Sequence, residues 1–361
     1  MTTPPARRPE ARRSSGRARS AAERTAVLVL VSLLGACSLG RTDPAPPVGS
    51  ASTPAPSVSP TPEPPAEPER SPYTGRKGGL GTPVMVVKMD NTPSAQPHRG
   101  LTRADIVYVE PVEFGLTRIA ALFSARMPTT VGPVRSARIS DVELFAQYGD
   151  IAFVYSGAQT KLRPILGRAD WTQVTPDLDS PGFFRESGGR VAPYNLMAQP
   201  ERILATAGAT AVSADMGLLF DPEPLAGGRT ARNVTARWPS STVQFVWDAS
   251  RGSYDVSLNG RTARDTDPPQ VQRAHSVIVQ YVKQKDSGFG DKFGGRTPLT
   301  ITTGKGRGLL LRDGRAHRIT WQRADEQVPT SYVDSDGEPV VLDRGQLWIL
   351  LMDRTREVSL D

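Results

Sequence analysis

A proline-rich segment near the amino terminus limits where a folded structure can begin in this chain. Eleven prolines occur from Arg41 through Pro72, and most of the other residues there are alanine, serine, threonine or glutamate. Such a composition buries too little apolar surface to fold, and it favours the extended polyproline II conformation. We therefore predict a disordered tether over residues 37–79, which places the folded part of the chain after it.

Residues 1–36 have the pattern of a lipoprotein signal peptide. An arginine-rich start is followed by an apolar core from Thr25 to Leu34, which is too short to cross a bilayer as a helix but typical of a signal peptide. The sequence Leu34-Gly-Ala-Cys37 resembles a bacterial lipobox, in which the cysteine receives a diacylglycerol, and Cys37 is the only cysteine. We predict lipid attachment at Cys37, with membrane lipid as a partner and an extracytoplasmic, membrane-anchored location.

The formal net charge of +7 suggests a nucleic-acid-binding protein, but much of this charge lies in the signal peptide. Residues 1–36 contain seven arginines and two glutamates, so the rest of the chain has 37 basic and 35 acidic residues. It contains no basic run interleaved with aromatic residues. Because nucleic-acid binding depends on clustered positive charge, we predict no nucleic-acid partner.

Strand-like and helix-like segments alternate in residues 80–225, which is typical of an α/β layer domain. Strands are predicted at 83–90, 105–110, 117–124 and 150–155, and helices after Ser140 and at 159–166 and 200–207. In the first helix, Ser140 and Glu143 have the spacing of a capping box, and Gly149 is placed to end it. We predict an amino-terminal α/β domain over residues 80–225.

Residues 233–361 contain short strand-like runs separated by turn signals, which indicates a smaller, mostly β domain. The runs are 242–247, 276–282, 299–303, 308–311 and 347–352. Asn259-Gly260, Asp313-Gly314 and Asp336-Gly337 are each typical of a tight hairpin turn. The predicted fold class is therefore an α/β layer domain followed by a mostly β sandwich or partly open barrel, with a hinge at 221–232.

Several motifs of the chain occur together in one known family. They are Lys88–Asn91, Gly100–Tyr108, Gly115–Arg118, Gly132–Arg138, Phe184-Arg185 and Ala192–Asn195, with looser similarity at 276–279, 304–306 and 347–349. In these motifs the chain resembles the YerB-type lipoproteins, a family with paired amino- and carboxy-terminal domains of unknown function. Tyr155 and Tyr194 stand where the family pattern has histidines, so the resemblance implies no imidazole role there. It implies an architecture and a location rather than a chemistry.

The sequence contains no recognisable metal-binding or nucleophile motif. The three histidines, His98, His275 and His317, are far apart, and none belongs to an H-E-x-x-H motif. No G-x-S-x-G motif is present. Residues 334–337 match only the start of a calcium-binding loop, which favours a hairpin turn. We predict no metal and no cofactor.

Two arginines and a serine come directly before the first predicted helix, whose free backbone N–H groups favour an anion. Arg135 and Arg138, with Ser136 between them, could bind a carboxylate or a phosphate through their guanidinium groups. Alternatively, Asp141 and Glu143 in the first turn of the helix neutralise this charge, Glu110, Glu113 and Arg118 do the same as buried ion pairs, and the arginines are structural. The sequence leaves both interpretations open.

Further polar residues could line the same cleft, since Asp90 and Asn91 end a predicted strand where α/β sheets often present ligand groups. The candidate ligand-binding residues are Arg135, Ser136, Arg138, Asp90, Asn91, Arg118, Arg185 and Asn195. We expect a non-enzymatic module that binds an anionic or polyhydroxylated envelope ligand, such as a cell-wall polymer or its fragment. The alternative is a hydrolase or transferase with an arginine clamp and a catalytic carboxylate pair drawn from Asp90, Glu110, Glu113 and Asp141. Whether the protein is an enzyme stays open.

Overall fold

The computed structural model describes residues 69–291 and 293–361. The predicted signal peptide, Cys37 and residues 37–68 of the predicted tether lie outside this part of the chain. Within the described ranges, no helix has the length and apolar character needed to cross a membrane.

Residues 69–79, which the sequence analysis assigns to the tether, are packed into the folded structure. Tyr73 is 2% exposed, and its ring lies edge-on to that of Tyr148 with 5.9 Å between the centroids. The backbone N–H of Ser71 donates to the carbonyl oxygen of Arg76 at 2.8 Å and closes a turn. The proline-rich composition of the segment predicted disorder although it contains one aromatic residue, Tyr73, that is buried in the fold. The folded part of the chain therefore begins before residue 80.

Replacing Tyr73 by alanine is expected to lower the free energy of unfolding by about 3 kcal/mol, because the lost ring leaves a cavity in a packed core. Leu80→Ala is the matched control, since Leu80 is 45% exposed. Urea denaturation of both variants measures the difference. Equal stability of the two variants would show that residues 69–79 contribute nothing to the fold.

A twelve-stranded sheet contains strands from both predicted domains, in the order β21-β20-β19-β17-β23-β2-β3-β1-β4-β5, with β18 beside β17 and β9 beside β20. Its amino-terminal strands are β1 (Met85–Asp90), β2 (Ile106–Pro111), β3 (Thr117–Phe123), β4 (Ala152–Val154) and β5 (Thr172–Val174). Its later strands are β9 (Arg229–Thr230), β17 (Ser276–Gly290), β18 (Arg296–Ile301), β19 (Gly304–Arg312), β20 (Arg315–Arg323), β21 (Ser331–Val333) and β23 (Leu347–Asp353). The parallel pairing of β2 with β23, in which Ile106 lies opposite Leu347, joins the two halves of the chain into one sheet.

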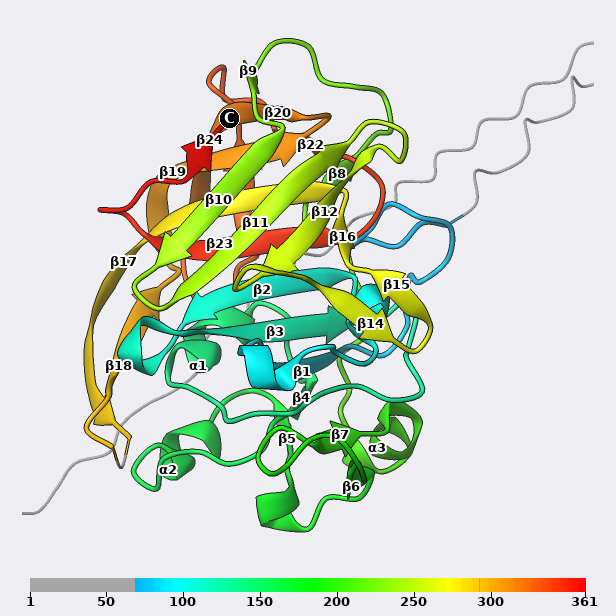
Figure 1. Ribbon diagram of the computed structural model, residues 1–361, viewed down its shortest axis with the longest axis vertical. Coiled ribbons are helices and arrows are strands. Elements are labelled where there is room, and N and C mark those ends of the chain that lie inside the picture. The colour runs from blue at the N-terminus through cyan, green and yellow to red at the C-terminus, as the bar shows by residue number, and fades with distance from the viewer. Residues whose placement is uncertain (1–68, 292) are drawn as a thin grey trace, which may run out of the picture. The chain divides into compact units, whose positions relative to one another are not determined.

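A second, antiparallel sheet covers one face of the large sheet. It consists of β10 (Asn233–Trp238), β11 (Ser241–Asp248), β12 (Ser253–Leu258), β13 (Arg261–Thr262), β16 (Arg273–Ala274) and β24 (Ser359–Leu360). Figure 1 shows β10, β11 and β12 in front of β23. Val243 and Phe245 of β11 point into the core between the sheets, where Phe245 lies edge-on to Trp348 of β23 at 5.7 Å. The period of two along β11 matches a strand with one buried face.

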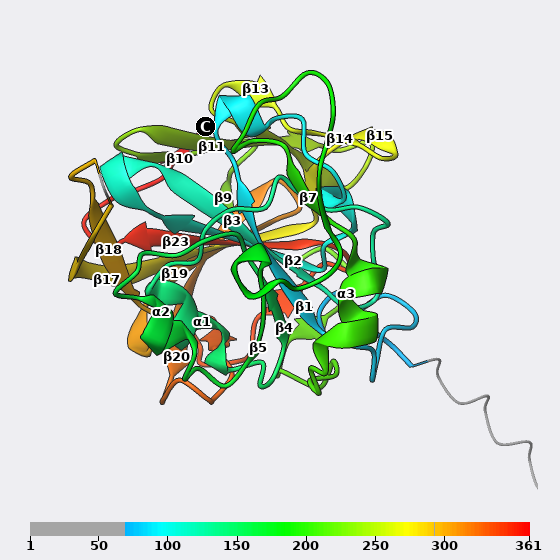
Figure 2. The ribbon, with the colours of Figure 1, turned by 90° about the horizontal axis from the view of Figure 1, so that it is seen from below.

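Two of the α-helices cover the opposite face of the large sheet, and the third packs into the core shared with the second sheet. The α-helices are α1 (Ser140–Ala146), α2 (Arg163–Leu166) and α3 (Pro200–Ala207), and the 3-10 helices are η1 (Pro93–Ala95), η2 (Leu101–Arg103), η3 (Glu113–Gly115) and η4 (Pro176–Leu178). In Figure 2, α1 and α2 lie on the side of β2 and β23 away from β10 and β11. Phe145 of α1 packs edge-on against Tyr108 of β2 at 5.6 Å. The strands β1, β2 and β23 are apolar at most positions because both faces of the sheet are covered.

Three two-stranded sheets complete the strands. They are β6 (Phe183–Arg185) with β7 (Leu196–Ala198), β8 (Leu219–Phe220) with β22 (Val341–Leu342), and β14 (Arg264–Thr266) with β15 (Pro269–Val271). The fold class predicted from the sequence is confirmed as a mixed α/β sheet region followed by a mostly β region. Asn259 and Asp313 adopt left-handed φ angles of 52° and 57° at their predicted hairpin turns.

The predicted capping box at α1 is wrong. Ser140 lies inside the helix, the residue before it is Ile139, and no side chain caps the helix start. The hydroxyl oxygen of Ser140 instead accepts the N–H of Thr300 at 2.9 Å, and Oε1 of Glu143 accepts the N–H groups of Thr302 and Thr303. Ser140 therefore ties α1 to β18, and Glu143 ties it to the two residues that follow β18. Both side chains bond to backbone N–H groups distant in sequence rather than to the start of their own helix.

Candidate functional site

Charged side chains meet on the face of β1, β3 and β2 that is turned toward α1. Asp90 lies opposite Arg118, and Arg118 lies opposite Glu110, in the register of the three strands. Residues that lie opposite one another on neighbouring strands point to the same face of a sheet. Lys88 points to the same face as Asp90, because it lies two residues before it on β1. With Asp141 of α1 they form what we call the buried charge cluster: Lys88, Asp90, Glu110, Arg118 and Asp141.

Lys88 holds two carboxylates of this cluster. Its Nζ donates to Oε1 of Glu110 and, at 2.7 Å, to Oδ1 of Asp141. All three side chains are inaccessible to solvent. Burial and then the negative charge of Asp141 raise the pKa of Glu110 to about 8, against the opposing charge of Lys88. This geometry is that of an ion-pair network closed off from solvent.

Asp90 positions two arginines. Its Oδ2 lies 2.8 Å from Nε of Arg135 and 3.7 Å from Nη2 of Arg118, while its Oδ1 accepts the N–H of Thr92 at 2.7 Å. Burial alone would raise the pKa of Asp90, but the charges of Arg118 and Arg135 hold it below its ordinary value. Asp90 is fully buried, whereas the Arg135 side chain is 22% exposed. Asp90 therefore anchors an arginine that reaches the surface.

Glu113 positions Arg138 in a similar way. Its Oε2 accepts hydrogen bonds from Nε of Arg138 at 3.0 Å and from Nη2 at 2.6 Å, and its Oε1 accepts the hydroxyl of Thr297. Nη1 of Arg138 donates to the carbonyl oxygens of Ser136 and Ala137. The side chains of these arginines pair with Asp90 and Glu113 rather than with the carboxylates of α1, and Glu113 was one of the partners that the structural alternative named. Truncating either arginine would leave a buried carboxylate short of a partner.

A pocket of about 1000 Å³ opens beside the two arginines. We call it the Arg135 pocket, and its lining residues are Arg135, Ser136, Arg138, Gly157, Ala158, Gln159, Thr160, Lys161, Pro193, Tyr194, Gly288, Phe289, Gly290, Asp291 and Phe293. The guanidinium carbon of Arg135 lies 5.6 Å from the centroid of the Tyr194 ring, a cation–π contact. The pocket thus joins the segment before α1, the segment before α2 and the end of β17.

The structure brings together only some of the predicted ligand-binding residues. Arg135, Ser136 and Arg138 line the pocket, and Asp90 lies behind Arg135. Asn91 is buried and donates to the Thr117 hydroxyl at 2.6 Å, and Arg118 is buried in the charge cluster. Arg185 and Asn195 bond each other at 2.8 Å across β6 and β7, and neither lines the Arg135 pocket.

The carboxylates of the alternative catalytic hypothesis face cations rather than an opening. Asp90, Glu110, Glu113 and Asp141 are each at most 3% exposed. Each forms an ion pair with Lys88, Arg118, Arg135 or Arg138, and none lines the Arg135 pocket. Across the described part of the chain, no group of three or more histidine, cysteine or acidic residues could hold a metal ion.

Sequence reasoning missed several residues of the pocket. Lys161 lies in a segment predicted as a helix, whereas Phe289 and Asp291 lie between the predicted strands 276–282 and 299–303. Tyr194 was identified from the sequence only as a tyrosine at a position where the family pattern has a histidine. No sequence periodicity identifies these residues as neighbours. They line one pocket only because the fold brings the end of β17 close to the segment before α2.

Comparison with known proteins identifies the family. Residues 73–213 match the N-terminal domain, and residues 234–349 the C-terminal domain, described as a protein of unknown function (DUF3048). A Bacillus subtilis (strain 168) protein named "Putative lipoprotein YerB" is 29% identical over 286 residues, which are 74% of this chain and 80% of that protein. The crystal structure of YerB protein from Bacillus subtilis covers 81% of this chain and 99% of its own, with a TM-score of 0.67 and 25% identity. The chain therefore belongs to the DUF3048 family, with both its N- and C-terminal domains, and is a distant homologue of Bacillus subtilis YerB.

Proposed function

We propose that this protein is an extracytoplasmic lipoprotein, anchored through Cys37, that binds an anionic or polyhydroxylated cell-envelope ligand in the Arg135 pocket without chemical turnover. The lipobox-like sequence before Cys37 supports the anchor, as does the name of the Bacillus subtilis homologue. The ligand assignment rests on the geometry of the pocket alone.

The position of Arg135 carries the proposal. Nε of Arg135 is held by Asp90 at 2.8 Å, and the guanidinium lies over Tyr194. Its two Nη groups, by contrast, form no hydrogen bond with any residue that the structure describes, and the side chain lines the pocket. One edge of the guanidinium is therefore fixed and the other is available. A preorganised guanidinium binds carboxylate or phosphate oxygens with little loss of side-chain entropy.

The other lining residues fit the same ligand class. Lys161 adds an exposed ammonium, and Asp291 is the only carboxylate in the lining of the Arg135 pocket. Oδ1 of Asp291 already accepts the N–H groups of Phe293 and Gly295 at 2.9 and 2.8 Å. The pocket is thus net positive, and the ring of Tyr194 offers an apolar surface to the carbon face of a sugar. A polymer with anionic and hydroxyl groups satisfies both features.

The hydrolase alternative lacks a comparable observation. Glycoside hydrolysis needs two carboxyl groups that flank the scissile bond. Asp291 is one carboxylate without a second in the pocket lining, and the predicted carboxylates are buried in ion pairs. Binding is the function that this arrangement supports best.

Co-sedimentation with isolated peptidoglycan that carries its anionic polymer tests the proposal, using the full-length protein. Lys161→Gln is expected to weaken binding roughly tenfold, because a charge-assisted hydrogen bond contributes about 1.5–3 kcal/mol. Arg135→Gln should weaken it at least as much. Lys161 is exposed and has no ion pair among the described residues, so its replacement should leave the fold intact.

Lys283→Gln is the matched control, because Lys283 is an exposed lysine outside the pocket and should bind as the native protein does. Circular dichroism establishes that each variant is folded. Native affinity in both Lys161→Gln and folded Arg135→Gln would refute the assignment of the ligand to this pocket. Binding that persists after the anionic polymer is stripped from the peptidoglycan would favour the polyhydroxylated part of the ligand.

A further inference from the structure

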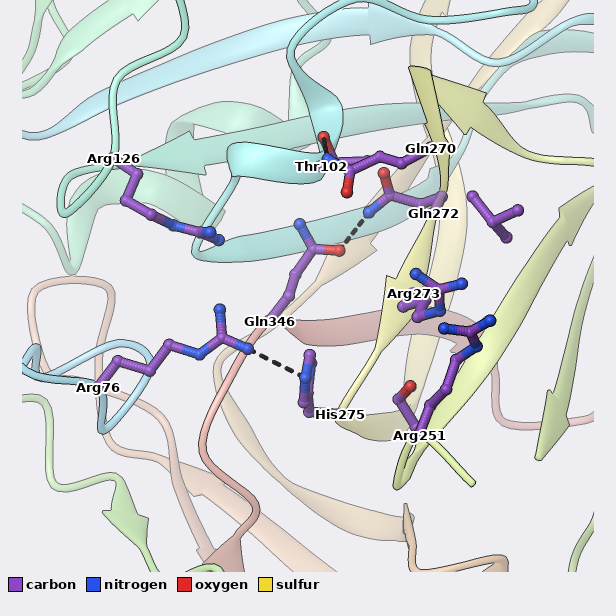
Figure 3. Close-up of a pocket in the computed structure, with 11 residues that line it drawn as sticks. Arg76, Thr102, Arg126, Arg251, Gln270, Gln272, Arg273, His275 and Gln346 are labelled. Atoms are coloured by element: carbon purple, nitrogen blue, oxygen red, sulfur yellow. Dashed lines mark hydrogen bonds between the residues drawn. The ribbon is translucent and has the colours of Figure 1, made fainter. Parts of the chain in front are cut away.

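A second pocket, of about 420 Å³, contains four arginines and lies where the two family domains meet. We call it the His275 pocket. Arg76 and Arg126 come from the amino-terminal half, and Arg251 and Arg273 come from the carboxy-terminal half. Figure 3 shows Arg76 and Arg126 reaching in from one side and His275, Arg251 and Arg273 on the other. No aspartate or glutamate is among the lining residues.

The positive charges of this pocket are only partly neutralised. Arg251 pairs with Asp248 at 2.9 Å, and Arg273 pairs with Asp255 at 3.0 Å. Arg126, by contrast, is exposed and has no hydrogen bond or ion pair with any residue in the described ranges.

Arg76 is not neutralised by an ion pair either. Its Nη2 lies 3.0 Å from Nε2 of His275, a neutral partner. Burial and then the positive charge of Arg126 lower the pKa of Arg76, and the carboxylates of Asp343 and Asp105 oppose this through space without forming an ion pair with it. Two guanidiniums therefore face the pocket without a carboxylate partner.

One lining residue of the pocket, Gln272, carries a buried acceptor without a partner. Gln272 is 1% exposed, and its Nε2 donates to Oε1 of Gln346. Gln346 is fixed in turn, since its Nε2 donates to the carbonyl oxygens of Leu101 and Ala104 at 3.0 and 2.8 Å. This leaves Oε1 of Gln272 without a hydrogen-bond partner. A buried amide oxygen without a partner is costly unless a ligand or water donates to it.

We propose that the His275 pocket binds a phosphate ester that carries hydroxyl groups. The Arg76 and Arg126 guanidiniums contact the phosphate oxygens, and a ligand hydroxyl donates to Oε1 of Gln272. Planar guanidinium forks match the geometry of phosphate, and the volume lies within the range of small-molecule pockets. This inference is independent of the ligand proposed for the Arg135 pocket, because the two pockets share no lining residue.

His275 provides a spectroscopic reporter. Burial and then the charges of Arg76, Arg126 and Arg273 lower the pKa of His275 to about 4. A bound phosphate would offset part of this positive charge, so we expect the pKa of His275 to rise when the pocket is occupied. The protein has only three histidines, so the ring resonance of His275 can be assigned with a His275→Gln variant.

Calorimetric titration of the full-length protein with glycerol 3-phosphate tests the inference, with glycerol and inorganic phosphate as the comparison ligands. We expect glycerol 3-phosphate to bind, glycerol not to bind, and inorganic phosphate to bind more weakly. Arg126→Gln should weaken binding of glycerol 3-phosphate at least tenfold and remove the shift of the His275 resonance. Arg168→Gln is the matched control, because Arg168 is exposed and lies outside both pockets.

Three outcomes would overturn the inference. The first is the absence of binding by the native protein at millimolar glycerol 3-phosphate. The second is native affinity in Arg126→Gln together with lost affinity in Lys161→Gln, which would place this ligand in the Arg135 pocket. The third is equal affinity for inorganic phosphate and glycerol 3-phosphate, which would remove the role assigned to Gln272.

Discussion

Replacing Lys88 by methionine is expected to lower the free energy of unfolding by about 3–5 kcal/mol, because it leaves the buried carboxyl groups of Glu110 and Asp141 without the ammonium that donates to both. Lys88 donates to both Glu110 and Asp141, and none of the three side chains contacts solvent. Urea denaturation measures the loss. Lys283→Met is the matched control, since Lys283 is exposed on β17 and its replacement should change stability little.

The effect of Lys88→Met should also depend on pH. The pKa of Glu110 is already raised to about 8 in the native protein, chiefly by burial. Without Lys88 it should rise further, so an ionised Glu110 opposes folding more strongly. A carboxyl with a raised folded pKa costs stability as the pH rises from its unfolded value toward its folded value, and the cost disappears on acidification. Below about pH 7 Glu110 is protonated in both folded proteins, so it costs them equally, and the difference between variant and native protein should grow only as the pH rises through about 8. The difference should therefore be larger at pH 9 than at pH 6, and a pH-independent difference over that range would contradict this role of Glu110.

Replacing Cys37 by alanine is expected to abolish lipid attachment and to leave the protein as unprocessed precursor or released from the membrane. The thioether bond to diacylglycerol forms at a cysteine sulfur, and Cys37 is the only cysteine of the chain. Metabolic labelling with a fatty-acid analogue, followed by membrane fractionation, measures both effects. Incorporation of the label should fall almost completely, because the variant has no cysteine to accept the diacylglycerol.

Ser38→Ala is the control for this experiment, since it changes the next residue and leaves the thiol in place. It should be labelled and retained as the native protein is. Label that persists in Cys37→Ala would show that the anchor lies elsewhere and would remove the basis for the proposed location.

The elements that sequence patterns predicted well are those that depend on local physics. α3 begins at Pro200 as expected, because proline is suited to the first turn of a helix, where its missing N–H costs nothing. Asn259-Gly260 forms the expected hairpin because both residues tolerate left-handed φ angles. The predicted strand at 83–90 contains β1, and its nearly continuous apolar run matches the coverage of both sheet faces in the structure.

The partners of polar groups could not be predicted in this way. Ser140 and Glu143 have a capping-box spacing, yet they bond to Thr300 and Thr302, about 160 residues away in the chain. For Arg135 and Arg138 the sequence left open a ligand, the carboxylates of α1 and buried pairs with Glu110 or Glu113. In the structure Arg138 pairs with Glu113, and Arg135 pairs with Asp90, which the sequence had placed only in the cleft. Spacing along a chain reports on neighbours within one or two turns, whereas an ion pair forms with whichever charge the fold brings within reach.

Sequence patterns identified β2 and β23 as apolar strands. They did not show that these two strands pair with each other across the two family domains. That pairing creates the large sheet and brings residues from near Arg76 to Gln346 around one pocket. Hydrophobic periodicity shows that a strand is buried and which of its faces is apolar, but it carries no label for the neighbouring strand. Pairing order is chosen by the packing of the whole core, so both pockets appear only in the tertiary structure.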